Sequence, residues 1–148
     1  MEKKQKYVKK QSEEYDYRQI AILGKTFFDA AQKCNDPKIE CVGWSHHLIV
    51  PIITNMTFAC ELFLKSILKY NNIEIRKHCL VELFEKLPKE FKEEIIGLEN
   101  EEIFYRNLTY ISDFFEKWRY LYEYYPFSAK YDFLQNFSNS LLNVIEKL

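Results

Sequence analysis

The chain is poor in the residues that make tight turns, with 3 Gly and 4 Pro among 148 residues. An all-β fold needs such turns between its many short strands, so the composition argues against that class. The sequence also lacks a run of about 18 uncharged apolar residues, and we therefore expect no membrane-spanning segment. Its charged first residues contain no apolar stretch of the kind found in secretory signals, so we expect no such signal either.

Most sequence signatures of catalysis are missing too. There is no glycine-rich phosphate loop, no H-E-x-x-H zinc motif and no G-x-S-x-G nucleophile turn. The four cysteines form no C-x-x-C pair, and although His46 and His47 lie near Cys41, nothing nearby supplies the other ligands of a metal site. We therefore expect no metal and no other cofactor. Free thiols suit a reducing compartment, which predicts a cytoplasmic location.

What the sequence does have is apolar and aromatic residues, which make up 47% and 17% of the chain. This content is sufficient for a folded core. The 21 Lys and Arg balance 22 Asp and Glu, which excludes a nucleic-acid binder driven by high net positive charge. Five lysines lie within residues 1–10, so we predict a basic, frayed segment over 1–12 and one domain over 13–148. Such a segment can contact phosphates or simply be solvated.

Apolar residues recur at three- and four-residue spacing, which is typical of amphipathic helices, and no segment shows sustained strand alternation. We expect four main helices, over 13–34, about 45–70, 101–125 and a last one capped by Ser128. A short helical pair, 80–87 and 89–98, is divided at Pro88. The sequence therefore predicts an all-α fold, an up-and-down bundle of four main helices with a short helical pair in one connection.

All four main helices have an apolar face, which in the last one is formed by Leu134, Phe137, Leu141, Val144, Ile145 and Leu148. The first helix should turn inward the stripe Ile20, Leu23, Phe27, Ala30, Ala31 and Cys34. The second has a continuous apolar arc made by Ile52, Ile53, Met56, Ala59, Cys60, Phe63, Leu64 and Ile67. Its other side is also partly apolar, so we expect it to be central to the bundle or covered on two sides.

One pair of charges lies on this second helix. Glu61 and Lys65 are four residues apart and share a face with Phe58, Leu62 and Leu68. The pair is either an ordinary surface ion pair or part of a polar site set in apolar surroundings.

Two further residues are candidates for chemistry. Arg119 lies at the edge of the apolar seam of the 101–125 helix, with Glu123 four residues later. Its guanidinium can bind a phosphate or carboxylate, or it can pair within the chain with Glu123 or Glu61. His78 precedes the short helix at Leu80, where it can act as an acid or base or merely hydrogen-bond to a neighbour.

Tyrosines are concentrated near the last two helices, at Tyr105, Tyr110, Tyr120, Tyr122, Tyr124 and Tyr125. Exposed tyrosines can stack on bases. At helical spacing they can equally belong to the core or to an oligomer interface.

Three runs of sequence are distinctive when taken in order: N-M-T-F-A-C-E-L-F-L-K-S-I-L (55–68), K-H-C-L-V-E-L-F-E-K-L-P (77–88) and F-x-x-W-R-Y-L-Y-E (115–123). Together they resemble the HEPN superfamily, the higher eukaryotes and prokaryotes nucleotide-binding domain. The resemblance spans roughly residues 15–148. It implies an α-helical bundle that usually dimerises and acts in bacterial defence, toxin–antitoxin or RNA-processing systems.

The resemblance also implies two kinds of role. Many members cleave RNA without a metal, using an Arg followed after four to six residues by a His, and two such motifs meet across a dimer cleft. Other members lack the motif and serve as binding or partner modules, often beside a nucleotidyltransferase. This chain departs from the ribonuclease pattern, because none of Arg18, Arg76, Arg106 and Arg119 is followed by His at that spacing.

The sequence and the resemblance together predict a HEPN-like homodimer that binds RNA or a nucleotide in a bacterial defence or toxin–antitoxin system. His78 and Arg119 are the candidate catalytic residues, and Glu61, Lys65 and Glu123 are candidate binding residues. If the chain is an enzyme, we expect a metal-independent endoribonuclease with a non-standard site. The alternative is a non-catalytic dimerisation or interaction module for a partner enzyme.

Overall fold

The computed structural model describes residues 16–35, 48–120 and 130–148. Within these ranges the chain is helical and contains no strand, so the predicted all-α class is confirmed. The helices are α1 (Tyr17–Cys34), α2 (Ile49–Tyr70), α3 (Leu80–Glu85), α4 (Lys89–Ile96), α5 (Glu101–Ile111), α6 (Phe114–Arg119) and α7 (Tyr131–Ile145). The predicted basic segment 1–12 lies outside the described residues.

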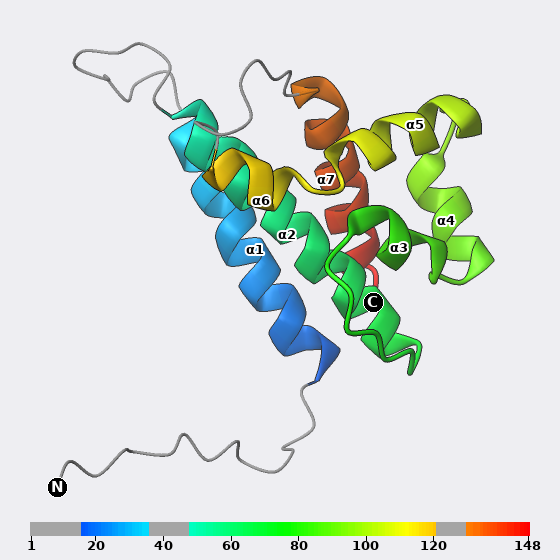
Figure 1. The fold of residues 1–148 in the computed structure, drawn as a ribbon. Helices are drawn as coiled ribbons and strands as arrows, with labels where there is room; N and C mark the ends of the chain where they lie inside the picture. Colours follow the sequence, from blue (N-terminus) through cyan, green and yellow to red (C-terminus); the bar gives the residue numbers. More distant parts are fainter. Residues whose placement is uncertain (1–15, 36–47, 121–129) are drawn as a thin grey trace, which may run out of the picture.

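Helix α2 lies at the centre of the fold (Figure 1). It contacts α1, α3, α6 and α7, while α4 packs on α7 and α5 packs on α3. Its predicted apolar arc is fully or almost fully buried, including Met56, Cys60, Phe63 and Ile67. The expectation of a central helix covered on more than one side is therefore confirmed.

By length and composition alone, α2 would also be able to cross a membrane, although it is not a run of uncharged apolar residues and was not predicted to span one. In the most apolar 18-residue stretch of α2, 61% of the residues are buried inside the fold. This burial is what the core helix of a soluble protein shows, because the neighbouring helices already cover the apolar faces.

Helix α1 packs on α2 through a face that only partly matches the predicted stripe. Ala31 is buried and Phe27 and Cys34 pack against the core as predicted, but Gly24 and Phe28 are buried as well and Leu23 is 48% exposed. The cause is the close approach of the two helices at Gly24. A Cβ added there would lie 2.9 Å from two ring carbons of Phe63 and 3.1 Å from Leu62 Cβ. The close approach at Gly24 therefore turns Gly24 and Phe28 toward α2 and leaves Leu23 exposed.

We expect Gly24→Ala to destabilise the protein. Phe63 is fully buried and cannot move away from the added methyl group, so overpacking should cost about 1–3 kcal/mol, of which better helix propensity returns up to about 1 kcal/mol. Urea unfolding measures the difference. Thr26→Ala, which adds an alanine to the exposed face of the same helix, is the control. A Gly24→Ala protein as stable as the wild type would contradict the close packing.

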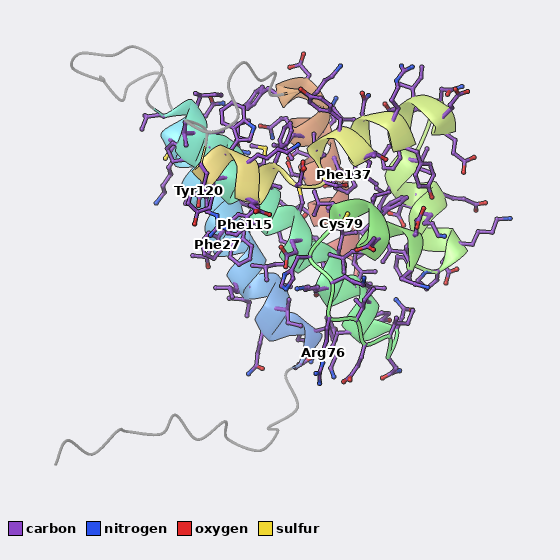
Figure 2. All side chains as sticks on the ribbon, in the orientation of Figure 1. Phe27, Arg76, Cys79, Phe115, Tyr120 and Phe137 are labelled. Carbon is purple, nitrogen blue, oxygen red and sulfur yellow. The ribbon has the colours of Figure 1, made fainter. Side chains whose placement is uncertain are left out.

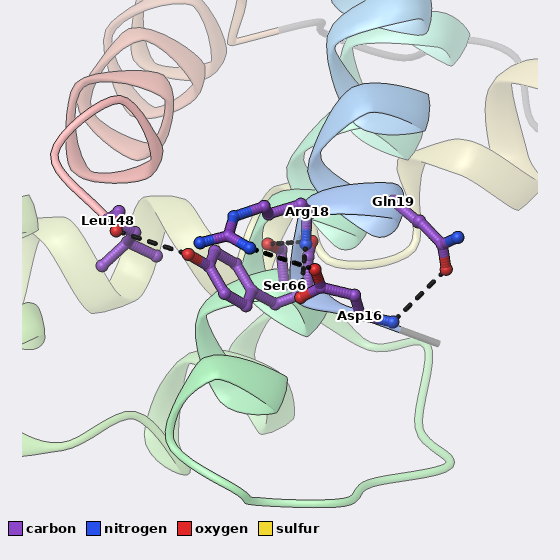
Figure 3. Close-up of polar contacts among 6 residues, drawn as sticks. Asp16, Arg18, Gln19, Ser66 and Leu148 are labelled. Carbon is purple, nitrogen blue, oxygen red and sulfur yellow. Dashed lines mark hydrogen bonds and ion pairs between the residues drawn. The ribbon is translucent and has the colours of Figure 1, made fainter. Parts of the chain in front are cut away.

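The start of α1 is fixed to distant parts of the chain (Figure 3). Asp16 caps the helix by accepting a hydrogen bond from Arg18 N, and the Gln19 side chain accepts one from Asp16 N. Tyr17 then makes two long-range contacts. Its hydroxyl donates to the Leu148 carbonyl at 3.3 Å, and its own carbonyl accepts from the buried Ser66 hydroxyl at 2.8 Å. These bonds hold α1, α2 and the C-terminal residue together.

The predicted long helix over 101–125 is wrong in one respect. It is interrupted at Ser112 and Asp113, which separate α5 from α6. The Ser112 hydroxyl donates to the Leu108 carbonyl at 2.7 Å and accepts from Val81 N at 3.1 Å. It thus supplies the cap that Cys79, at the start of α3, does not provide. The kink gives α6 a different course from α5, and α6 packs on α2.

The last helix starts later than expected. It begins at Tyr131, after Lys130 in a left-handed backbone conformation (φ 47°), while the predicted cap Ser128 lies outside the described residues. Of its predicted inward residues, Leu134, Phe137, Leu141 and Val144 are buried, while Ile145 and Leu148 are partly buried against the core. The up-and-down order of four main helices stays a prediction.

Candidate functional site

A groove of about 680 Å³ lies where α6 and the connection before α3 meet α2. This volume is typical of small-molecule binding sites. The groove is lined by Phe58, Glu61, Leu62 and Lys65 of α2, by His78 and Cys79 of the connection, by Ser112 and Asp113 of the kink, and by Phe115, Glu116 and Arg119 of α6. The kink at Ser112 therefore places α6 over this part of α2.

The groove brings together four of the five residues that the sequence singled out. Glu61, Lys65, His78 and Arg119 all line it, although they come from three separate segments of the chain. The fifth residue, Glu123, lies outside the described part of the structure.

Glu61 is the centre of a tight polar cluster. It is 4% exposed, and its Oε1 atom lies 2.7 Å from Lys65 Nζ and 2.7 Å from His78 Nδ1. A buried carboxylate requires such partners, because an unpaired charge inside the fold is costly. Of the two readings left open for Glu61 and Lys65, an ordinary surface ion pair is wrong, because the carboxylate is buried and also binds a residue from another segment.

His78 Nδ1 lies 2.7 Å from Glu61 Oε1 and 3.4 Å from Lys65 Nζ. The shorter contact favours the tautomer in which Nδ1–H donates to the carboxylate, because an ionised carboxylate only accepts hydrogen bonds. Nε2 is then the acceptor of the neutral ring. The His78 side chain is 79% exposed, which leaves Nε2 accessible to a bound molecule. A histidine held by a carboxylate in this way is oriented to accept or donate a proton.

Arg119 lies exposed at the α6 side of the groove. Its Nε donates to the Phe115 carbonyl at 3.1 Å, and its guanidinium lies 4.3 Å from the centre of the Phe115 ring. Within the described ranges it pairs with no carboxylate, so the proposed Arg119–Glu61 pair is wrong, and the Arg119–Glu123 pair concerns an undescribed residue. The terminal nitrogens of Arg119 are available to an anionic group.

Aromatic rings form the wall beside Arg119. Phe58 and Phe115 are stacked with ring centres 4.8 Å apart, and Phe27 meets Phe58 edge to face at 4.7 Å. Figure 2 shows Phe27, Phe115 and Tyr120 grouped where α6 lies over α1 and α2. Both Phe58 and Phe115 are partly exposed, so flat apolar groups can pack against them.

The charges that line the groove nearly cancel. Lys65 and Arg119 are balanced by Glu61, Asp113 and Glu116, and Asp113 is in turn paired with Lys117 at 2.8 Å. Such a groove does not attract anions by net charge. It has instead separate cationic groups, at Lys65 and at Arg119, which favour a phosphate held at a defined position.

Sequence reasoning missed several lining residues, notably the Phe58–Phe115 wall, Cys79 and Ser112. The signal for Phe58 was its place beside Glu61 and Lys65 on one side of the helix. No sequence signal indicated Ser112, because its role depends on Val81, which is 31 residues away.

Other reactive groups lie apart from the groove. Burial raises the pKa of the Cys60 thiol, which therefore stays protonated and unreactive. Burial, with a smaller contribution from Glu101, raises the pKa of Tyr105, and burial followed by Asp132 does the same for Tyr131. Among the described residues, no group of three or more His, Cys, Asp or Glu is placed to hold a metal ion.

We expect Glu61→Gln to lower the free energy of unfolding. The amide cannot accept two charge-assisted hydrogen bonds as strongly, but Lys65 and His78 can turn toward water, so we expect a loss of about 1–2 kcal/mol. Thermal or urea unfolding gives the value. Glu93→Gln is the matched control, because its pair with Lys89 is on the surface and should contribute about 0.5 kcal/mol or less. Equal effects of the two substitutions would contradict a structural role for the cluster.

Comparison with protein-family models, with curated proteins and with solved structures found no significant match to this chain.

Proposed function

We propose that this chain is a HEPN-like helical protein that binds RNA or a nucleotide in the groove between α2 and α6. One observation carries the proposal. Each of the three runs that resemble the superfamily contributes a polar residue to the same groove: Glu61 and Lys65 from the first, His78 from the second and Arg119 from the third. The three runs are separate in the sequence, and the fold brings their polar residues to one place.

The proposed binding mode uses the aromatic wall and the charged side chains of the groove. A base packs against the exposed parts of the Phe58 and Phe115 rings, which are stacked on each other with the Arg119 guanidinium over Phe115. A phosphate accepts hydrogen bonds from Arg119, whose terminal nitrogens have no carboxylate partner within the described ranges, and from Lys65. The carboxylates Asp113 and Glu116 are placed at the same groove to accept hydrogen bonds from ribose hydroxyls or base amino groups.

A ribonuclease step is the second part of the proposal. His78 Nε2 takes the proton of an RNA 2′-hydroxyl, and the 2′-oxygen attacks the adjacent phosphorus. The bond from phosphorus to the 5′-oxygen breaks, and that oxygen takes a proton from water. Arg119 stabilises the additional negative charge on the phosphoryl oxygens. The products are a 2′,3′-cyclic phosphate and a free 5′-hydroxyl, and no metal takes part.

A non-catalytic interaction module is the second candidate, and exposed apolar residues favour it. Ile22 is 68% exposed beside Leu23 on α1, and Tyr110 and Tyr120 are also partly exposed. Such residues suit contact with another chain. On this reading the protein docks on a partner enzyme, for which a nucleotidyltransferase is the candidate that the resemblance suggests.

The wider setting belongs to the proposal as well. We place the protein in the cytoplasm, as a homodimer within a bacterial defence or toxin–antitoxin system, with its main helices in up-and-down order. Free cysteines among the described residues, Cys34, Cys60 and Cys79, support a reducing compartment.

The test uses the purified full chain. Binding of a 5′-mononucleotide and of a short single-stranded RNA is measured by calorimetry, and RNA cleavage is measured with a chelator present. The proposal expects binding that weakens as salt rises, and cleavage that is lost in His78→Ala without loss of binding. Binding without cleavage removes the ribonuclease step. A dimer that binds neither ligand favours the interaction module and overturns the proposal.

A further inference from the structure

A second, smaller hollow of about 210 Å³ adjoins the groove through a shared residue. Lys65 lines both cavities. The second hollow lies between α1, the end of α2 and the connection 71–79, and Lys69, Glu74 and Arg76 contribute its other charges. Figure 2 shows Arg76 and Cys79, which belong to the same connection but line different hollows.

The second hollow has more cationic side chains than carboxylates among the described residues that line it, unlike the groove. These are Lys65, which is itself paired with Glu61 at 2.7 Å, Lys69 and Arg76, beside the carboxylate of Glu74. Glu74 pairs with Lys69 at 3.3 Å, and its side chain is 83% exposed, so this is a weak surface pair. Arg76 has no ion-pair partner within the described part of the chain. An arginine left unpaired beside two lysines is suited to bind a phosphate.

Lys65 is a cationic residue that the two cavities share. Its ammonium group has three N–H donors, and the bond to Glu61 Oε1 at 2.7 Å uses one of them. The same nitrogen lies 3.4 Å from His78 Nδ1, and Lys65 lines both cavities, so its ammonium group can also donate to a group bound in either of them. The groove therefore contains Arg119 and Lys65, and the second hollow contains Lys65 and Arg76. The stacked Phe58 and Phe115 rings lie beside Arg119 in the groove.

The floor of the second hollow is apolar. Ile20, Leu68, Ile73 and Ile75 line it. A chain of phosphates alone would leave these side chains facing charged oxygens. A sugar or base beside the phosphate would cover them and bury apolar surface.

We propose that the second hollow is a phosphate subsite, so that the ligand is a single-stranded oligonucleotide that spans both cavities. One nucleotide occupies the groove, with its base on Phe58 and Phe115. The phosphate of the neighbouring nucleotide binds Arg76, and its sugar or base covers the isoleucines. This inference rests on the proposed function, because it assumes that the groove holds a nucleotide.

The test compares three ligands: a 5′-mononucleotide, a nucleoside triphosphate and a 5′-phosphorylated tetranucleotide. We expect Arg76→Ala to weaken tetranucleotide binding about tenfold, to leave mononucleotide binding within about twofold, and to reduce the salt dependence by about one phosphate contact. Glu74→Gln should instead tighten tetranucleotide binding about two- to threefold, because it removes a carboxylate that lines the hollow.

Lys77→Ala is the matched control. Lys77 is adjacent to Arg76 and equally cationic but lines neither hollow, so its loss should change tetranucleotide affinity by less than about twofold. Equal losses in Arg76→Ala and Lys77→Ala would overturn the subsite. So would a triphosphate that is as sensitive to Arg76→Ala as the tetranucleotide, since it would identify the hollow as a polyphosphate site. If mononucleotide binding survives these results, the proposed function stands; if no ligand binds to the wild type, both fall.

Discussion

Replacing Arg119 with alanine is expected to weaken nucleotide and RNA binding by about 10- to 100-fold, because two or more charge-assisted hydrogen bonds to phosphate are lost. The side chain is exposed on α6 and has no carboxylate partner within the described ranges, so its loss should change the free energy of unfolding by about 0.5 kcal/mol or less. Calorimetric titration of both ligands measures the effect. Circular dichroism shows that the fold is retained.

Two further variants separate charge from geometry. Arg119→Lys keeps the charge but not the planar fork, so its affinity should lie between those of the wild type and the alanine variant. Arg106→Ala removes an exposed arginine from α5, which lines neither hollow, and should bind like the wild type. Equal affinity of Arg119→Ala and Arg106→Ala would remove Arg119 from the site.

The largest loss of stability is expected for Phe84→Ala. Phe84 is fully buried in α3, and its ring lies 5.0 Å from that of Phe104 and 6.2 Å from that of Phe137, so it joins α3 to α5 and α7. Truncation leaves a cavity and should cost about 3–5 kcal/mol. Urea unfolding followed by tryptophan fluorescence measures the loss.

Phe91→Ala on α4 is the control for this substitution. Its ring is only partly buried, so the loss should be clearly smaller, about 1–2 kcal/mol. If Phe84→Ala costs no more than Phe91→Ala, the aromatic cluster around Phe84 does not hold α3 in place. The position of α3 matters for the site, because His78 and Cys79 immediately precede it.

The features that follow from the helical spacing of apolar residues were predicted correctly from the sequence. The apolar arc of α2, the turn at Pro88 and the inward face of α7 are all present. Helical spacing also placed Glu61 and Lys65 on one face, and they are in contact. These features are local, and each requires only that a helix forms and buries its apolar side.

Features that depend on contacts between segments could not be predicted. The rotation of α1 follows from Gly24, whose lack of a side chain carries no hydrophobic signal. The break between α5 and α6 depends on Ser112 bonding to Val81 of another helix. The Glu61–His78 contact depends on the course of the non-helical connection before α3, which has no periodicity to indicate it.

The central claim, that the groove between α2 and α6 binds a nucleotide, is tested most directly by the reactivity of Cys79, which lines it and is partly exposed. Alkylation at each cysteine is followed by mass spectrometry with and without a saturating 5′-phosphorylated oligonucleotide. We predict that Cys79 alkylation slows in proportion to the fraction bound, while Cys34 on α1 is unaffected. Cys60 should stay unmodified throughout, because burial raises its pKa. An unchanged Cys79 rate at a ligand concentration that saturates binding would contradict the account.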